Sequence, residues 1–281
     1  MDQPNTSLKS TGQDFAKGEE LHVFTTARWD PLLLESAENT AASCNRVCPI
    51  YLLEHHWTRL QVAKWSTSFA RGSPADLLRN LMLGIKQWSA TNPGQNPKAL
   101  RIKHRVYASG RITTEITPEA RIPLSYLFPT TFDQVPDRPE SEYWTVTLDT
   151  VATEISATTM YKTGDRYSYD RARSAAGIKS YSEPKEVLLY NPDNEIMDGS
   201  ITTAYFYRNG QWITPASAAG GQQGTTRRWA LQRGLCIEGT VQANELQDGE
   251  VLWLSNAVRG YYKARFVART MDGDGVQRVE R

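Results

Sequence analysis

The sequence lacks the features of a membrane protein, a secreted protein or a general nucleic-acid binder. No run of about 18 apolar residues occurs in the 281 residues, so no membrane-spanning helix is predicted. Lysine and arginine number 32 against 31 aspartates and glutamates, which leaves no broad basic field for nucleic acid. The polar start, MDQPNTSLKSTGQDF, does not resemble a secretory signal. We therefore expect a soluble protein with no membrane and no nucleic-acid partner.

Cysteine is also scarce. Cys44 and Cys48 are four residues apart, but the only other cysteine is Cys236, so the second ligand pair of a structural zinc site is missing. We predict no metal site, three reduced thiols and a cytoplasmic location. Hydrophobic residues at 40% and charged residues at 22% are typical of a globular protein.

The hydrophobic pattern predicts an α+β protein of two α/β domains. In the first half it indicates a strand over 21–30, with Phe24, Thr26 and Arg28 on one face, and helices over 51–70 and after Ser73. A hairpin over 99–118 completes the first sheet. The second half combines strands, one of them buried and ending at Ser255, with a helix at 167–176 and a hairpin turn at 208–210. We place a smaller domain at 15–125, a proline-rich connector at 126–145 and a larger domain at 146–281.

The clearest ligand-binding pattern is the segment GGQQGTT (220–226), which leads directly into a predicted helix. Glycines allow a backbone to approach a ligand, and a helix start offers free N–H groups, threonine hydroxyls and a positive dipole end. These groups suit a phosphate, although a glycine loop with a threonine cap has the same pattern. The Gly-Lys-Ser/Thr ending of a Walker loop is absent.

Four further segments could contribute to a ligand site, but none of them indicates one by itself. By residue type alone, Ser255 and Asn256 form a turn after a buried strand, Lys162 is a surface lysine and Asp198 is a turn acid before a glycine. Arg59 is either a surface arginine or an inward-facing cation that requires an anion. A partly desolvated lysine near a phosphate can lose its proton and attack a carbonyl group.

In their order and spacing, these segments resemble the fold type IV pyridoxal-phosphate enzymes, the group of branched-chain aminotransferases and aminodeoxychorismate lyases. The resemblance runs from Phe24 to about Phe266 and is closest to the fungal lyases. It is carried by FTTARWDPLLL, HHWTRL, YKTGDRYSYDRAR, EVLLYNPDNEIMDGSITTAYFY, GGQQGTTRRWALQRGLC and VLWLSNAVRG.

The resemblance implies the D-amino acid aminotransferase-like architecture, with an active site between the two domains and pyridoxal 5'-phosphate as cofactor. Lys162 is implied as the residue that bonds to the cofactor and moves the proton, and Thr26 as a catalytic hydroxyl on the substrate side. The remaining implied contacts are to the phosphate and to the ring nitrogen: Arg59, Thr225, Thr226, Ser255 and Asn256 for the phosphate, and Asp198 for the nitrogen.

This sequence departs from the family pattern at four positions. Asp198 stands where glutamate is common, which shortens the acid by one methylene group. Tyr161 replaces a frequent histidine, Gly164 a polar residue and Thr203 an asparagine of the wider fold. These changes suit a relative that acts on another substrate or one that has lost activity.

Three functions follow from the resemblance. The first is a lyase that converts 4-amino-4-deoxychorismate to 4-aminobenzoate and pyruvate in folate precursor synthesis. The second is a class IV aminotransferase, or another biosynthetic relative, that acts on a different amine. The third is a homologue that keeps the fold without catalysis. A small-molecule amine substrate and a homodimer are implied for the enzymatic functions.

Overall fold

The computed structural model describes residues 20–61, 72–133, 139–271 and 277–278. The chain forms two compact units, the first comprising Met1–Leu124 with Tyr161–Asp165 and the second Ser125–Met160 with Arg166–Arg281. The polar amino-terminal segment and residues 62–70 of the helix predicted at 51–70 lie outside the described residues. Among the described helices, none combines the length and apolar character needed to cross a membrane.

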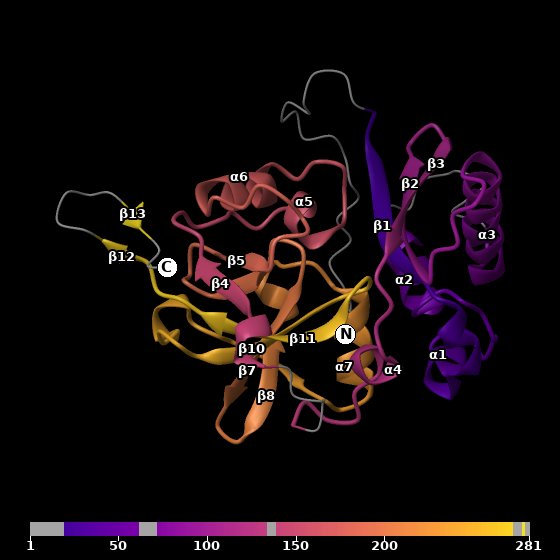
Figure 1. The fold of residues 1–281 in the computed structure, drawn as a ribbon. Helices are drawn as coiled ribbons and strands as arrows, with labels where there is room; N and C mark the ends of the chain where they lie inside the picture. Colours follow the sequence, from indigo (N-terminus) through magenta and orange to yellow (C-terminus); the bar gives the residue numbers. More distant parts are fainter. Residues whose placement is uncertain (1–19, 62–71, 134–138, 272–276, 279–281) are drawn as a thin grey trace. The chain divides into compact units, whose positions relative to one another are not determined.

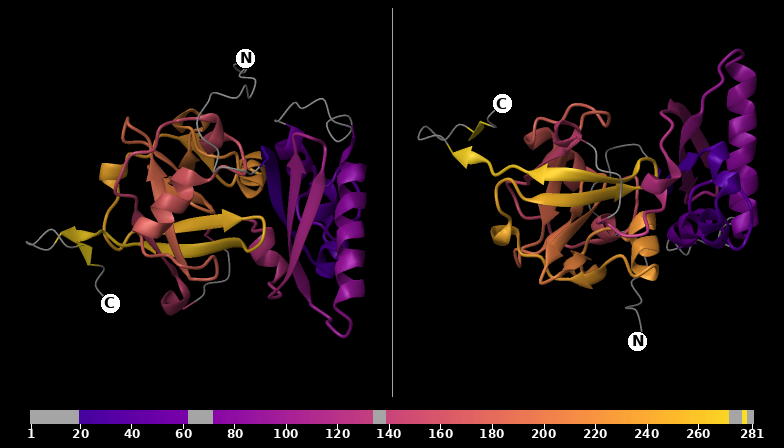
Figure 2. Two further views of the ribbon diagram at one scale, coloured as in Figure 1. Left: turned by 90° about the horizontal axis from the view of Figure 1, so that it is seen from above. Right: turned by 60° about the horizontal axis from the view of Figure 1, so that its bottom comes forward.

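The first unit is a three-stranded antiparallel sheet with helices on one face (Figure 2). Its strands are β1 (His22–Trp29), β2 (Ala99–Tyr107) and β3 (Ile112–Glu119), in that order across the sheet. Val23 and Ala27 of β1 and Ile102 of β2 pack with apolar residues of the helices in one core. The helices are η1 (Pro31–Glu35), α1 (Ala37–Ala41), α2 (Leu53–Gln61) and α3 (Pro74–Thr91).

Local sequence explains the ends of these elements. Ser73 caps α3 by accepting the N–H of Asp76, and the Asp76 carboxylate accepts the N–H of Ser73 in return. Gly110, at a φ of 88°, supplies the positive angle of the turn between β2 and β3. The strand over 21–30, the helix after Ser73 and the hairpin over 99–118 are therefore confirmed.

The second unit is an eight-stranded mixed sheet in the order β6-β5-β4-β11-β10-β7-β8-β9. Figure 1 labels β4, β5, β7, β8, β10 and β11 of this sheet. Its strands are β4 (Trp144–Leu148), β5 (Lys185–Tyr190), β6 (Ile196–Gly199), β7 (Thr203–Arg208), β8 (Gln211–Pro215), β9 (Ile237–Gly239), β10 (Val251–Asn256) and β11 (Gly260–Phe266). Asn209 and Gly210 both have positive φ, at 52° and 81°, which confirms the predicted hairpin turn between β7 and β8.

Short helices connect these strands. They are α4 (Leu124–Leu127), α5 (Ala157–Met160), α6 (Tyr167–Ala175) and α7 (Thr225–Gln232), with single turns η2 (Glu140–Glu142), η3 (Ser217–Ala219) and η4 (Ala243–Glu245). The pair β12 (Thr270–Met271) and β13 (Gln277–Arg278) forms a separate ribbon. Within the segment predicted as a connector, Phe132 stacks on Trp253 with ring centroids 5.7 Å apart. Helices with a mixed sheet confirm the α+β class.

Candidate functional site

The glycine loop ends at the first turn of α7, as predicted. Gly224 is the N-cap, and it has no side chain with which to cap the helix start. Thr225 and Thr226 follow as the first two residues and are both buried. A Cβ atom at Gly221 would lie 2.3 Å from the carbonyl oxygen of Met197, so only glycine allows the loop to pack this closely on β6.

The hydroxyl group of Thr226 belongs to a buried cluster that joins three elements. Ser255 Oγ on β10 donates to Thr226 Oγ1 at 2.8 Å, and Tyr205 OH on β7 lies 2.8 Å from Ser255 Oγ. Tyr261 OH donates to the carbonyl oxygen of Thr226 at 2.7 Å. These bonds hold the first turn of α7 against the end of β10.

Asn256 lies next to this cluster, but its side chain mainly stabilises a turn. Its Oδ1 atom accepts the N–H groups of Val258 and Arg259 at 3.0 and 2.9 Å. Its amide nitrogen donates to Tyr262 OH at 3.4 Å, a long hydrogen bond. Of the residues predicted to surround a phosphate from this unit, Thr225, Thr226 and Ser255 are thus brought together, with Asn256 at the following turn.

Asp198 lies in β6, so the description of this residue as a turn acid is wrong. Its side chain is buried, and Oδ2 accepts the backbone N–H of Gln222 at 3.1 Å and lies 3.5 Å from Tyr169 OH. Gln222 is two residues before the N-cap of α7. One short loop therefore links the acid to the helix start.

Glu186 fixes the loop that follows Asp198. This buried carboxylate accepts hydrogen bonds from the backbone and hydroxyl of Ser200, from the Ile201 N–H and from the Thr202 hydroxyl. Arg173 lies 3.9 Å from it. The chain after β6 is therefore held by charge-assisted hydrogen bonds rather than by local sequence preference.

Lys162 lies in the other compact unit, along the edge of β1. Its carbonyl oxygen accepts the N–H of Phe24 at 2.9 Å, and Thr163 forms a bridge with Val23. The Lys162 ammonium lies 5.0 Å from the centre of the Phe24 ring. The lysine is therefore on the face of β1 that carries Phe24 and, two residues further along, Thr26.

Arg59 lies on α2, three residues after His56, which connects this helix to β1. The His56 side chain on α2 is fully buried, and its Nδ1 lies 2.6 Å from Thr25 Oγ1 on β1. Burial, and then the charges of Arg59 and other neighbours including Lys162, lower the pKa of His56 well below its usual value. The buried His56 imidazole is therefore neutral.

The same face of the first sheet carries a row of cations that sequence reasoning did not identify. In the strand register, Arg101, Lys103 and Arg105 on β2 lie opposite Arg28, Thr26 and Phe24 of β1. Arg105 pairs with Glu115 at 2.9 Å, and all three cations lower the pKa of Glu115 after a hydrogen bond from Arg105. We call Arg101, Lys103 and Arg105 the basic row. Each of its side chains is partly buried.

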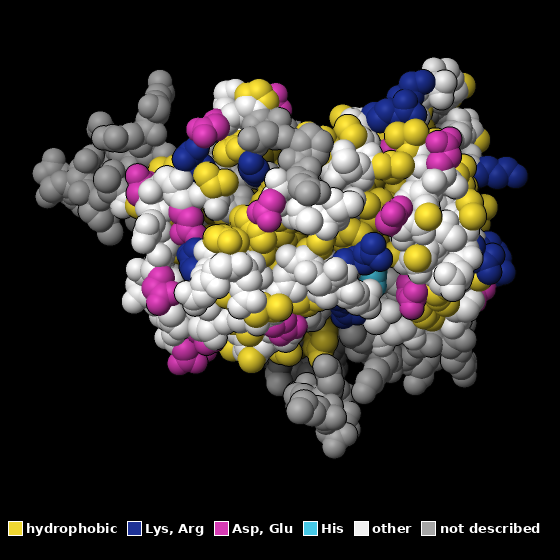
Figure 3. Space-filling model, turned by 90° about the horizontal axis from the view of Figure 1, so that it is seen from below, with side chains coloured by type: hydrophobic (Ala, Val, Ile, Leu, Met, Phe, Trp, Pro, Cys, Tyr) yellow, Lys and Arg dark blue, Asp and Glu magenta, His cyan; other side chains and the backbone are white. Residues whose placement is uncertain are grey.

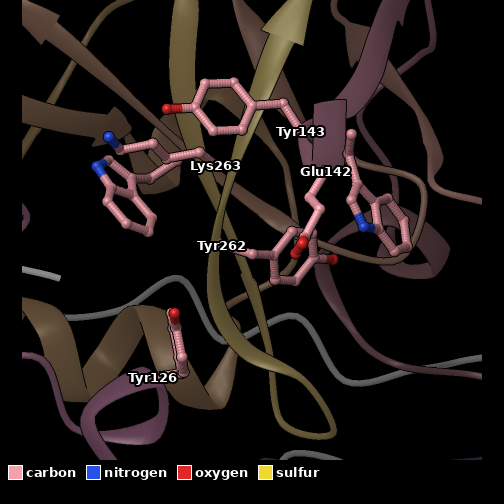
Figure 4. A pocket seen from close by; sticks show the side chains of 7 residues that line it. Tyr126, Glu142, Tyr143, Tyr262 and Lys263 are labelled. Carbon is pink, nitrogen blue, oxygen red and sulfur yellow. The ribbon is translucent and has the colours of Figure 1, made fainter. Parts of the chain in front are cut away.

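A separate hollow in the second unit contains none of the predicted site residues. Tyr143, Tyr262 and Lys263 border it in Figure 4, with Tyr126, Glu142, Trp144 and Trp253. The Lys263 ammonium lies 5.5 Å from the Tyr143 ring and 5.7 Å from that of Trp253, so a side chain of the protein already contacts these aromatic faces.

On the surface shown in Figure 3, acidic and basic side chains are interspersed.

Sequence reasoning missed Tyr169, Tyr205 and Glu186. The side-chain hydrogen bonds that connect them to the site join residues 14 to 50 positions apart in the sequence. No local sequence pattern distinguishes the two tyrosines or Glu186 from residues of the same type elsewhere in the chain. The predicted site residues fall into two groups, with Thr26, Arg59 and Lys162 in the first unit and the others in the second.

Comparisons with known proteins identify the family and the fold of the chain. The model of the family described as "Amino-transferase class IV" matches residues 44–265. A Schizosaccharomyces pombe protein named "Putative aminodeoxychorismate lyase" is 28% identical over 213 residues, which is 75% of this chain and 81% of that protein. The Saccharomyces cerevisiae aminodeoxychorismate lyase is 33% identical over 135 residues, 43% of this chain and 36% of that protein.

Solved structures share the fold. The branched-chain amino acid aminotransferase of Escherichia coli superposes with a TM-score of 0.58 at 14% identity, covering 92% of this chain and 79% of that one. At this identity the likeness concerns the architecture alone, which is that of the fold type IV enzymes. With the family model matching most of its length, the chain belongs to the class IV aminotransferase family.

Proposed function

We propose that this chain is a pyridoxal-phosphate-dependent lyase that converts 4-amino-4-deoxychorismate to 4-aminobenzoate and pyruvate. Family membership supports pyridoxal-phosphate chemistry in general. The two fungal relatives are named for the lyase, which supports the narrower reaction.

The residues of the second unit fit the cofactor. An uncapped helix start with buried threonine hydroxyls suits a phosphate dianion, because its N–H groups and hydroxyls all donate hydrogen bonds. A buried carboxylate, Asp198, is tied to the same loop and suits a protonated ring nitrogen. The donor set and the acid thus match the two ends of pyridoxal phosphate.

The observation that carries the proposal is that Lys162 and Thr26 share one face of β1. The lysine is paired to the strand through Phe24, and the Thr26 side chain is partly exposed two residues further along. An amine and a hydroxyl group that are held on the same face of a strand can both reach the reacting atoms of one substrate. This arrangement supports Lys162 as the base and Thr26 as the substrate-side hydroxyl.

The basic row supports a dicarboxylate substrate. Aminodeoxychorismate carries one carboxylate on its ring and one on its enolpyruvyl group. Lys103 lies opposite Thr26 in the strand register, and Arg101 and Arg105 lie two residues to either side. Cations at these positions would stabilise the carboxylates of a bound substrate, whereas they would not stabilise the aliphatic side chain of a branched-chain amino acid substrate.

The chain's own residues account for most of the proposed reaction. Bound pyridoxal phosphate supplies an electron sink for carbanion chemistry. The Lys162 amine takes the proton from the ring carbon that bears the substrate's amino group. The bond between the ring carbon and the enolpyruvyl oxygen breaks, and enolpyruvate leaves with the electron pair. It becomes pyruvate by taking up a proton at its methylene carbon, and the ring becomes aromatic. Asp198 keeps the cofactor's ring nitrogen protonated.

A single experiment distinguishes the lyase from its alternatives. Purified protein with pyridoxal phosphate is incubated with aminodeoxychorismate, with and without a keto acid, and 4-aminobenzoate and pyruvate are quantified. We expect both products without the keto acid, and none from Lys162→Ala. Turnover that requires the keto acid supports an aminotransferase instead.

The covalent role of Lys162 is tested on the protein alone. Absorption spectra are recorded with pyridoxal phosphate before and after borohydride, followed by peptide mapping. We expect the modified residue to be Lys162. A protein that stays colourless at saturating cofactor would support the non-catalytic alternative, and full activity in Lys162→Ala would disprove the mechanism.

A further inference from the structure

Three buried hydroxyl groups form a continuous hydrogen-bonded series from the sheet to the start of α7. They belong to Tyr205 on β7, Ser255 on β10 and Thr226 on α7, and each residue is at most 1% exposed. The two oxygen–oxygen distances are both 2.8 Å, which is normal for O–H···O bonds.

The direction of the series follows from the number of protons. Each hydroxyl has one proton to donate. Ser255 donates its proton to Thr226 Oγ1, so the bond between Ser255 and Tyr205 must be donated by the phenol. Burial raises the pKa of Tyr205, and the phenol therefore keeps its proton.

Thr226 is the last member of the series. Its oxygen accepts from Ser255, so its own proton is directed away from Ser255 toward another acceptor. In the part of the chain that the structure describes, no other group accepts this proton. The hydroxyl lies in the first turn of a helix whose N-cap residue has no side-chain cap. A donor with an unused proton therefore lies where the helix favours an anion.

We propose that Tyr205 is a positioning residue that, through Ser255, fixes the proton of Thr226 Oγ1 for donation to the cofactor phosphate. The inference rests on the proposed function for the identity of the anion. Donors that polarise one another in series also strengthen the final hydrogen bond. Phenylalanine would keep the ring contacts of Tyr205 with Phe132 and Tyr261 but would release the orientation of Ser255.

The test compares ligands with and without the phosphate. Dissociation constants for pyridoxal 5'-phosphate and pyridoxal are measured by quenching of tryptophan fluorescence, for the unmodified protein and for Tyr205→Phe. We expect the variant to bind pyridoxal phosphate about tenfold more weakly, because a hydrogen bond to a charged group is weakened. Pyridoxal should bind both proteins equally, since it has no phosphate.

Two further variants complete the experiment. Ser255→Ala removes the middle hydroxyl, and we expect it to lose at least as much of the preference for the phosphate as Tyr205→Phe. Tyr190→Phe is the matched control, because Tyr190 packs partly buried beside the core of the same sheet and lies in neither the series nor the loop. It should bind both ligands as the unmodified protein does.

The outcomes separate this inference from the proposed function. If the unmodified protein prefers pyridoxal phosphate and both variants keep the full preference, the series has no role and only the inference is overturned. Equal weakening for the two ligands would indicate general loosening and would also overturn it. If the unmodified protein shows no preference for the phosphate, the proposed cofactor site is wrong and the inference falls with it.

Discussion

The phenol oxygen of Tyr169 lies 2.9 Å from the carbonyl oxygen of Thr159 and 3.5 Å from Oδ2 of Asp198. Burial, followed by the charge of Asp198, raises the pKa of Tyr169 well above its usual value, so the phenol stays protonated. It therefore presents one proton to two acceptors. The ring of Tyr169 is held in turn beneath the Arg166 guanidinium, 4.7 Å from its centre. The Tyr169 phenol is thus an uncharged neighbour of the Asp198 carboxylate, held in a fixed position.

Tyr169→Phe should reduce catalysis without removing the cofactor. The change deletes one weak donor to Asp198, while the Gln222 N–H remains. We expect kcat to fall about fivefold, which corresponds to about 1 kcal/mol for a long hydrogen bond to a charged group. The dissociation constant of pyridoxal phosphate should change less than kcat. Steady-state kinetics with Tyr190→Phe as control will show this, and an unchanged kcat would refute a role for Tyr169.

Asp198→Glu should give a slower enzyme, although it restores the residue common in the family. The two donors to Oδ2 are placed for an aspartate, and a Cβ atom on the neighbouring Gly221 would already lie 3.3 Å from the Asp198 Cβ. An added methylene group must displace the carboxylate or its neighbours. We expect a lower kcat and an unfolding free energy reduced by about 1–2 kcal/mol, measured in urea. A faster enzyme would mean that the aspartate is simply too short.

Elements with strong local signals were predictable from the sequence. Ser73 and Asp76 mark the start of α3, and Asn209-Gly210 marks the turn between β7 and β8. Each signal depends on residues within a few positions of the feature that it determines. Along β2, buried and partly buried residues alternate, as expected for a strand with one face on the core.

Features that depend on distant residues were not predictable. β6 was missed because its four residues follow a turn and end in glycine, and its pairing with β5 and support from Glu186 determine its conformation. The edge position of Lys162 depends on β1, which is near the amino terminus and far from Lys162 in the sequence. For such residues only the family resemblance indicated importance, and it gave no indication of Tyr169 or Tyr205.

Arg101→Gln should weaken the binding of a dicarboxylate. Arg101 belongs to the basic row and lies opposite Arg28, whose charge is already paired with Asp30. We expect KM for aminodeoxychorismate to rise about tenfold, with a smaller effect on kcat, because the charge acts on binding rather than on the proton transfer. Arg79→Gln is the control, since its side chain is 74% exposed on α3. Equal KM values for the two variants would argue against substrate binding by the row.

Protonation of His104 should destabilise the first unit in mild acid. The imidazole is fully buried on β2, with Nδ1 3.0 Å from Thr114 Oγ1, and burial lowers its pKa to about 4. In the unfolded chain a histidine titrates near 6.5, so between these values the unfolded state binds a proton that the folded state does not. The unfolding free energy therefore decreases as the pH falls from about 6.5 toward 4, and the loss is complete below that range.

Urea unfolding at pH 7.5 and pH 5.0 will measure this effect. Linkage with the two pKa values gives a loss of about 2 kcal/mol over the interval for His104 alone. His104→Asn cannot take up the proton, and its unfolding free energy should depend less on pH by about that amount, even if the variant is less stable at both values. His56, whose pKa is also lowered, contributes a loss of the same sign in both proteins. An identical pH dependence for parent and variant would show that His104 is not the titrating group.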